Sequence, residues 1–542
     1  MTNDESELTS SDLAPRSLEV HAVGQQSAAA GEVTIADLVV SLGAVISDPG
    51  DVHLPLTGVR LDSRRVRPGD LFVALPGMQV HGAQFAQQAI DAGAVAILTD
   101  PDGARLISAA ELHVATLIVP NPRHAMAVAS AMIYGCPSKK LSMLGVTGTN
   151  GKTTTTLMIE HALTSIKRPV ATIGTLGTRM NGSPVPNEIS TVTTPESPQL
   201  QELLARYLAA DGEWVAMEVS SHALALERVS CTKFDVAGFT NLGRDHLDFH
   251  RTMTEYFEAK AKLFTAEMTR SAVLNIDDPA GVELARRAHA AQLAVLTTGR
   301  CEQADVRILD WRPNQSGSTV RIEMLGQLLE FQLGMPGEFN VRNAATTLAM
   351  LALAKLEIST LLDSFADVQI PGRMQSVPLA ARGPHAAPQV FVDFGHTPQA
   401  ITAALQAAAA ADGRLIAVLG AGGDRDPEKR GPMGAAAASL ADLVIVTDDN
   451  PRSEPPAVIR QQIIDGAHEQ LREDGSTREV EIFDAGDRAA AIKLALQIAE
   501  PQDRVVILGK GHEQTQEIAG VRVPFDDVTA ASQAWVELGE QA

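Results

Sequence analysis

Cysteine and positive charge are both scarce in this sequence of 542 residues. Its three cysteines, Cys136, Cys231 and Cys301, are far apart and lack metal-ligand spacing, so they predict neither a disulfide framework nor a zinc site. The formal net charge of −22, without a local basic patch, argues against a nucleic-acid partner, because the phosphates would be repelled.

Long apolar runs are also missing. No stretch approaches the roughly 20 residues that a membrane-spanning helix needs. The first residues are acidic and polar, where a secretory signal would be basic and then apolar. We therefore expect a cytoplasmic protein that is not inserted in a membrane.

The length is sufficient for several domains, and strand-like runs alternate with helical ones along most of the chain. Residues 1–32 lack sustained periodicity and predict a disordered tail. The sequence predicts an α/β fold with a small N-terminal domain (33–137), a central P-loop ATPase-like domain with a parallel sheet (138–371) and a C-terminal Rossmann-like domain (372–542). Strands are expected at 70–75, 94–98, 141–146, 214–219, 235–240, 271–275, 389–393, 414–420, 442–447 and 504–509, and helices at 83–92, 256–264 and 343–355.

A glycine-rich turn, GVTGTNGKTTT at 145–155, follows one expected strand and opens a helix. Backbone N–H groups and the helix dipole at such a turn converge on phosphates. Lys152 would meet the β- and γ-phosphates, Thr153 would hold Mg²⁺, and Gly148 and Gly151 would let the backbone approach the anion. Val146 stands where the strict Gly-x4-Gly-Lys-Thr pattern has its first glycine, so a chance turn is the alternative interpretation.

The sequence Gly148-Thr-Asn-Gly-Lys-Thr153 is the form that this loop takes in the Mur ligases and in folylpolyglutamate synthetase, and the chain resembles that superfamily. The resemblance extends from Asp62-Ser-Arg to Gly509-Lys-Gly-His-Glu513 and follows the motif order of the tripeptide-forming Mur ligases. A helix-capping Asn and a surface Arg are the alternative interpretations for two of the implied positions, Asn343 and Arg373. The resemblance implies ATP contacts at Gly148, Thr149, Asn150, Gly151, Lys152, Thr153, Thr154, Asn343 and Arg373.

A second group of residues is implied to act in catalysis through Mg²⁺, together with Lys152 and Thr153. Glu218 ends an expected strand, where its carboxylate could reach a metal held by the phosphate loop; a solvated acid is the alternative. His246 matches a family histidine that contacts a second magnesium, although Gly243 replaces the usual Thr or Ser. Lys260 matches a lysine that is carbamylated in the family, which would turn a cation into a metal ligand. Lys262 competes with it but faces elsewhere on a helix.

The resemblance also implies a site for a nucleotide-linked sugar peptide. Ser63 lies in a segment like the one that holds the UDP end, which composition alone would assign to a turn. Hydroxyls and a guanidinium suit the oxygens of a muramoyl dipeptide. Leu226 replaces a Gln of some family members, so one polar contact is missing. The implied contacts to UDP-N-acetylmuramoyl-L-alanyl-D-glutamate are Ser63, Thr193, Thr194, Ser220 and Arg228.

The segment Asp449-Asn-Pro-Arg452 resembles the motif that marks the diaminopimelate-adding branch of the family. The planar fork of Arg452 can hold the distal carboxylate of diaminopimelate with two hydrogen bonds, and a lysine substrate has no such carboxylate. Glu513 suits the distal ammonium. A solvated Asn-Pro-Arg turn is the alternative interpretation. The implied diaminopimelate contacts are Arg425, Asp449, Asn450, Pro451, Arg452, Gly509 and Glu513.

Together these motifs imply an ATP-dependent ligase of peptidoglycan synthesis. ATP would convert the D-glutamyl carboxylate into an acyl phosphate, which the amine of meso-2,6-diaminopimelate then attacks. Superfamily ligases that use lysine, D-Ala-D-Ala, or folate with glutamate are alternatives, and Arg452 with Arg425 speaks against each. A nucleotide-dependent switch or motor is the alternative from another class. His396 resembles a further family motif, to which we assign no role.

Overall fold

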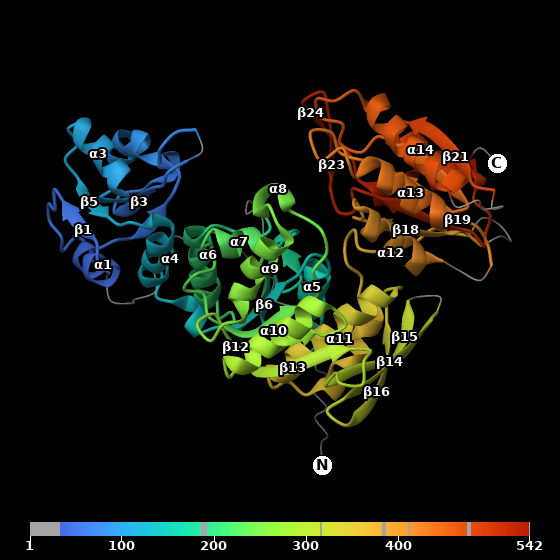
Figure 1. The fold of residues 1–542 in the computed structure, drawn as a ribbon, viewed down its shortest axis with the longest axis horizontal. Helices are drawn as coiled ribbons and strands as arrows, with labels where there is room; N and C mark the ends of the chain where they lie inside the picture. Colours follow the sequence, from blue (N-terminus) through green and yellow to red (C-terminus); the bar gives the residue numbers. More distant parts are fainter. Residues whose placement is uncertain are drawn as a thin grey trace, which may run out of the picture.

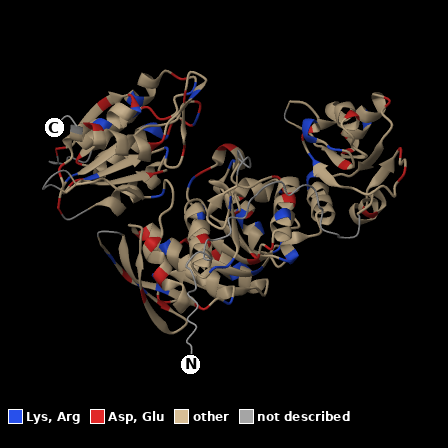
Figure 2. Cartoon of the chain, turned by 180° about the vertical axis from the view of Figure 1, so that it is seen from behind, with Lys and Arg blue, Asp and Glu red and all other residues tan. Residues whose placement is uncertain are grey.

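Three β-sheets follow one another along the chain, and Figure 1 shows the central one between the other two. The computed structural model describes residues 33–77, 79–185, 192–314, 317–381, 386–409, 412–473 and 479–540. The tail expected at 1–32 lies outside these residues. Figure 2 shows acidic and basic residues interspersed over all three parts of the molecule. No helix in the described ranges is long and apolar enough to span a bilayer.

The first sheet has five strands and is covered by helices on both faces. Its elements are α1 (Ile35–Leu42), β1 (Val45–Ser47), β2 (Gly58–Arg60), η1 (Ser63–Arg65), β3 (Asp70–Ala74), η2 (Gly82–Phe85), α2 (Ala86–Asp91), β4 (Ala96–Thr99), α3 (Pro101–Ala109), β5 (Ala115–Ile118) and α4 (Pro122–Ile133). The strand order is β1-β5-β4-β3-β2, and all strands except β1 are parallel. Apolar residues of α1 and α4 pack on one face, and those of η2, α2 and α3 on the other. The strands expected at 70–75 and 94–98 are therefore confirmed.

The central sheet has eleven strands. They are β6 (Ser142–Thr147), β7 (Val170–Gly174), β8 (Gly177–Met180), β9 (Ser183–Pro184), β10 (Trp214–Glu218), β11 (Phe234–Phe239), β12 (Thr269–Asn275), β13 (Ala294–Gly299), β14 (Val306–Pro313), β15 (Ser318–Met324) and β16 (Gln327–Leu333). The order is β16-β15-β14-β13-β12-β11-β6-β10-β7-β8-β9, parallel from β14 to β7 and antiparallel at both ends. The antiparallel extensions were not expected. Burial alternates along β15, as is usual for a strand with one solvent-facing side.

Helices cover both faces of this sheet. They are η3 (Pro137–Lys139), α5 (Lys152–Ser165), α6 (Ser197–Ala209), α7 (Ser221–Ala225), α8 (Leu247–His250), α9 (Met253–Ala261), η4 (Lys262–Phe264), α10 (Pro279–Ala290), α11 (Glu338–Leu353), η5 (Ile358–Thr360) and η6 (Leu362–Asp367). α5 and α11 pack on one face, α6, α7 and α10 on the other. Each fully buried Leu or Met contributes about 1.5–3 kcal/mol. This packing holds the start of α5 at the middle of the sheet.

The helix expected at 343–355 is wrong at its start. The structure begins α11 at Glu338, directly after Gly337, and ends it at Leu353. An acidic residue in the first turn complements the helix dipole, which favours the earlier start. Asn343 therefore lies inside the helix and does not cap it.

The third sheet is doubly wound. Its elements are β17 (Gln375–Val377), β18 (Gln389–Asp393), α12 (Pro398–Ala408), β19 (Leu415–Leu419), α13 (Arg430–Leu440), β20 (Leu443–Thr447), α14 (Pro456–Glu473), β21 (Glu481–Gly486), α15 (Arg488–Ile498), β22 (Arg504–Leu508) and α16 (Asp527–Glu540), with a separate hairpin of β23 (Thr515–Ile518) and β24 (Val521–Pro524). The order is β17-β18-β22-β19-β20-β21, parallel except for β17. The four strands expected here are confirmed. α12 to α14 cover one face, α15 and α16 the other.

Candidate active site

The glycine-rich turn connects β6 to α5, as the sequence predicts. Gly148 and Gly151 have φ angles of +150° and +87°. A Cβ on Gly148 would lie 1.9 Å from Thr240 Oγ1, and one on Gly151 would lie 2.4 Å from Asn343 Oδ1, so neither position has room for a side chain. Val146 is a buried residue inside β6, where the chain does not turn. A glycine is therefore not needed at that position.

Backbone and side-chain hydrogen bonds hold the turn in place. Asn150 N donates to Asn241 Oδ1 at 2.9 Å, and Asn241 Nδ2 returns a bond to Asn150 O at 3.1 Å. Thr240 Oγ1 also donates to Asn150 O. Thr149 Oγ1 accepts from Gly243 N at 2.8 Å. The residues that follow β11 thus support a phosphate-sized turn at the start of α5.

Lys152 lies in the first turn of α5 and folds back over the loop. Its Nζ donates to the carbonyl oxygens of Gly148 and Thr149, each at 2.9 Å. Burial lowers the pKa of Lys152, whereas the carboxylates of Glu218 and Asp245 oppose this change. The ammonium is thus held beside the loop by groups that an anion could replace.

Glu218 ends β10 and is almost completely buried. Its Oε1 accepts from Thr175 N at 2.8 Å and its Oε2 from Thr175 Oγ1 at 3.1 Å. Glu218 and Thr153 line the same cavity. Thr175 was missed in the sequence, although a signal was present: it follows β7, which is parallel to β10, and such strand ends meet at one edge.

Lys260 is buried at the end of α9, and its Nζ donates to Gly148 O at 2.8 Å. The ammonium lies 4.5 Å from the centroid of the Tyr256 ring. Burial holds the pKa of Lys260 well below its usual range, the charge of Lys152 lowers it further, and Asp245 opposes both. Lys262 follows α9 and is exposed. Of the two candidate lysines, only Lys260 faces the phosphate loop.

His246 lies just before α8, in a left-handed conformation with φ +53°. Its Nε2 is 3.5 Å from Asp245 Oδ2, and its ring centroid is 4.8 Å from that of His222. Burial lowers the pKa of His246 and Asp245 opposes this change. Within the described residues, no group of three or more His, Cys, Asp and Glu is arranged to hold a metal. A metal here would need the Thr153 hydroxyl or a modified lysine as well.

Two residues of the C-terminal part, Arg373 and His396, interact electrostatically with acids near the phosphate loop. The Arg373 guanidinium lies 4.5 Å from the centroid of the Phe394 ring. Burial lowers the pKa of Arg373, and the charges of Asp393 and Glu218 oppose this. Burial also lowers the pKa of His396, with Asp245 again opposing it. Side chains of the central and third sheets therefore share one electrostatic environment.

Four residues expected to hold the dipeptide lie together beside Glu218. Thr194 Oγ1 is buried and donates to Glu218 O at 2.9 Å. Ser220 Oγ lies 3.3 Å from Thr194 Oγ1. Thr193 Oγ1 is 3.4 Å from Thr175 Oγ1. Arg228 donates to Thr194 O at 3.1 Å and to Glu196 Oε1 at 2.9 Å.

Ser63 lies in η1, in the N-terminal part that contains the first sheet. It is buried and donates to Gln88 Oε1 at 2.7 Å. Arg123 of α4 pairs with Glu196 at 3.2 Å, and Glu196 also pairs with Arg228. The first and central parts are therefore joined through an ion-pair network that contains one of the expected dipeptide contacts.

The residues expected to hold the amino acid follow three neighbouring strands, β22, β19 and β20. Asn450 Nδ2 donates to Glu513 Oε2 at 2.8 Å, and Lys510 Nζ lies 3.1 Å from both Asn450 Oδ1 and Glu513 Oε2. Burial raises the pKa of Glu513, but Lys510 and Asn450 outweigh it and the pKa is lowered. Lys510 was missed in the sequence because its role depends on contacts between loops.

Arg452 has φ +50°, and its Nη1 donates to Gly423 O at 2.5 Å. Asp449 is buried, which raises its pKa, while Arg488 and Lys510 lower it. The remaining residues of this group are placed around these two: Gly509 lies against Asp449, Pro451 is buried, and Arg425 is exposed on the loop after β19.

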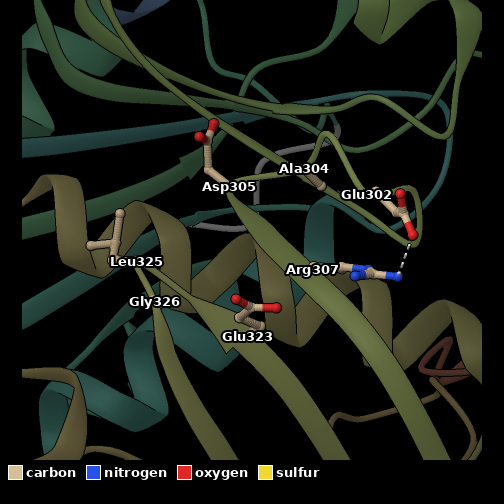
Figure 3. A pocket seen from close by; sticks show the side chains of 7 residues that line it. All are labelled: Glu302, Ala304, Asp305, Arg307, Glu323, Leu325 and Gly326. Atoms are coloured by element: carbon tan, nitrogen blue, oxygen red, sulfur yellow. Dashed lines mark ion pairs between the residues drawn. The ribbon is translucent and has the colours of Figure 1, made fainter.

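A separate pocket lies between the end of β13 and strands β14 and β15 (Figure 3). Asp305 accepts from the N–H and hydroxyl of Thr297 at 2.8 and 2.7 Å. Arg307 Nη2 points toward Glu302 Oε1 at 3.7 Å. Strands β13, β12 and β11 lie between β14 and β6, so this pocket is not part of the phosphate site. Its lining residues are Glu302, Ala304, Asp305, Arg307, Glu323, Leu325 and Gly326.

Three family models match the chain: the Mur ligase family, catalytic domain over residues 55–134; the Mur ligase middle domain over 146–351; and the Mur ligase, glutamate ligase domain over 372–511. The chain is 42% identical over 503 residues to the UDP-N-acetylmuramoyl-L-alanyl-D-glutamate--2,6-diaminopimelate ligase of Corynebacterium efficiens, covering 91% of this chain and 93% of the relative. It is 42% identical over 506 residues to the protein of the same name from Streptomyces coelicolor, with 91% and 94% covered.

Solved structures agree with this assignment. A UDP-N-acetylmuramoyl-L-alanyl-D-glutamate--2,6-diaminopimelate ligase is 31% identical, with a TM-score of 0.66, and the match covers 93% of this chain and 99% of that one. MurF from Acinetobacter baumannii, 17% identical with a TM-score of 0.62 over 94% of this chain and 99% of its own, shares the fold. The chain belongs to the Mur ligase family.

Proposed function

We propose that the chain is an ATP-dependent ligase that adds meso-2,6-diaminopimelate to UDP-N-acetylmuramoyl-L-alanyl-D-glutamate in peptidoglycan synthesis. The observation that carries the proposal is the arrangement at the ends of β19, β20 and β22, where Arg452, Asn450 and Glu513 lie around one loop cluster. Ligands bind at such strand ends in doubly wound sheets. A guanidinium and a carboxylate together suit an amino acid that carries a second carboxylate and a second ammonium. Relatives that are 42% identical are named for the same substrates, which supports the proposal.

The phosphate loop would carry the activation step. A carboxylate does not condense with an amine directly, because oxide is a poor leaving group. Transfer of the γ-phosphoryl group to the D-glutamyl carboxylate makes an acyl phosphate, and the diaminopimelate amine displaces phosphate from it. Lys152 and the N-terminus of α5 stabilise the charge on the transferring group. Asn343, which lies beside Gly151, and Arg373, which lies over the Phe394 ring, would hold the rest of ATP. Because ATP and a UDP-linked sugar are its proposed substrates, the reaction would take place in the cytoplasm.

Thr153, Glu218, His246 and Lys260 as its carbamate would hold Mg²⁺. The residues fit hard-cation chemistry, because oxygen-bearing side chains, the buried Glu218 and Thr153, line one cavity. Bound Mg²⁺ would neutralise phosphate charge. The lowered pKa of Lys260 supports carbamylation, which requires a neutral amine that attacks carbon dioxide. Carbon-13 NMR in labelled bicarbonate tests this: a carbamate signal is expected in the wild type and lost in Lys260→Ala but retained in Lys262→Ala. The same signal in Lys260→Ala would contradict it.

The dipeptide end would lie at Thr193, Thr194, Ser220 and Arg228, with Ser63 toward the UDP. Arg228 already pairs with a carboxylate, Glu196, so it can exchange that partner for an oxygen of the substrate. The D-glutamyl carboxylate would then lie near Glu218 and the phosphate loop, since Thr194 bonds to the backbone of Glu218.

The deciding experiment measures phosphate release from ATP with the UDP-linked dipeptide present. Diaminopimelate, L-lysine or no amino acid is added in parallel reactions. Release with diaminopimelate alone is expected. Release with lysine would refute the assigned selectivity but would still support a ligase. Release without any acceptor would favour a nucleotide-dependent switch or motor.

A further inference from the structure

The hairpin of β23 and β24 contacts the loop 449–452, which we call the recognition loop because it carries Asp449, Asn450 and Arg452. Gln516 of β23 is buried, and its Nε2 donates to Asp449 O at 2.8 Å and lies 3.4 Å from Asp448 O. The next residue, Glu517, donates its N–H to Asn450 Oδ1 at 3.0 Å. The hairpin therefore contacts the recognition loop at its side chains and at its backbone.

The same hairpin sets the backbone of Arg452. Arg452 N donates to Glu517 O at 3.0 Å, and Ala519 N donates to Arg452 O at 2.7 Å. These bonds form a parallel bridge between Arg452 and Ile518. Arg452 has φ +50°, a conformation that costs energy for a residue with a Cβ and persists only where its surroundings impose it. The hairpin supplies those surroundings.

Gln516 is the side chain that connects the two sets of contacts. Both of its acceptors are main-chain carbonyls in the loop, and they lie one and two residues before Asn450. The loop after β20 has left its strand ladder at this point, so these carbonyls depend on other donors. Without the amide, the carbonyl groups of Asp448 and Asp449 would lose this donor, and the segment before Asn450 would be held less firmly.

We propose that Gln516 is a positioning residue for amino-acid recognition: its amide fixes the Asp449–Arg452 loop so that the Arg452 guanidinium meets the distal carboxylate of the acceptor amino acid. The inference rests on the proposed function. A group on a rigid support binds its ligand with less loss of entropy, and small displacements of a binding group weaken it strongly. Both contacts of the Gln516 amide go to the backbone here, at Asp448 O and Asp449 O, so its effect should be specific to the amino-acid substrate.

The test compares Gln516→Met, which keeps the shape and removes the donor, with Thr515→Val on the exposed side of the same strand. We expect the KM for diaminopimelate to rise about 10-fold in Gln516→Met, since one positioned hydrogen bond and the geometry of a second are lost. The KM values for ATP and for the UDP-linked dipeptide should stay within about twofold of the wild type. Thr515→Val should behave as the wild type.

Gln516→Glu is the second variant, because it keeps the size and turns an acceptor toward the two carbonyls; its KM for diaminopimelate should rise further. The proposal would be overturned by equal rises in all three KM values or by an unchanged KM for diaminopimelate. It would also be overturned if both Gln516 variants failed to fold, because Gln516 would then be needed for stability of the fold. If the wild-type protein released no phosphate in response to diaminopimelate, the proposed function would be refuted as well.

Discussion

Replacement of Arg452 by lysine tests amino-acid recognition with the charge kept constant. Nη1 donates to Gly423 O at 2.5 Å, which leaves other guanidinium N–H groups available for a ligand carboxylate. Lysine cannot form two parallel hydrogen bonds with a carboxylate, and it would also lose the hydrogen bond to Gly423 O. Loss of one charge-assisted hydrogen bond costs about 1.5–3 kcal/mol. This corresponds to a decrease of about 10- to 150-fold in kcat/KM for diaminopimelate. The φ of +50° burdens both residues alike, so backbone strain does not contribute to the difference.

The assay is phosphate release with diaminopimelate varied and the other substrates saturating. Arg522→Lys on β24 is the matched control, because Arg522 is an exposed guanidinium outside the recognition loop. The KM for ATP should not change in either variant. An Arg452→Lys protein with wild-type kcat/KM for diaminopimelate would refute the two-bond recognition of the distal carboxylate.

Three further changes test the phosphate loop, a buried ion pair and the titration of His222. Gly151→Ala places a Cβ 2.4 Å from Asn343 Oδ1 at φ +87°, so nucleotide binding measured by calorimetry should weaken at least about 10-fold; unchanged binding would contradict the tight-loop geometry. Arg488→Met leaves the fully buried Asp527 unpaired and should reduce the free energy of unfolding by about 3–5 kcal/mol in denaturant titrations, whereas a loss below about 1 kcal/mol would show that the pair is dispensable. Burial and nearby histidines lower the pKa of His222 to about 4, so the folded state binds fewer protons and stability should fall as the pH drops from about 6.5 to about 4. In His222→Gln, melting temperatures should depend less on pH over this window; an identical profile would be evidence against the assignment.

The sequence by itself determined the α/β class, many of the parallel strands and the phosphate loop. Short apolar runs that end in Gly, Asp or Thr mark buried parallel strands, and the order of the motifs indicated the family. Local chemistry was sufficient, because a glycine turn between a strand and a helix is encoded within residues 145–155. The antiparallel edges, β8, β9, β15 and β16, escaped the prediction, since their pairing depends on partners at the edge of a completed sheet.

Only the tertiary structure decided which side chains act together. It placed the Lys260 ammonium against Gly148 O, placed Asn343 inside α11 against Gly151, and brought Thr175 to Glu218. It also supplied the support of the recognition loop from Gln516, which lies 64 residues along the chain from Arg452. Contacts of this kind depend on how the ends of separate strands meet in space, and the resulting burial shifts the pKa values. Neither the contacts nor the pKa shifts can be predicted from residue spacing along the chain.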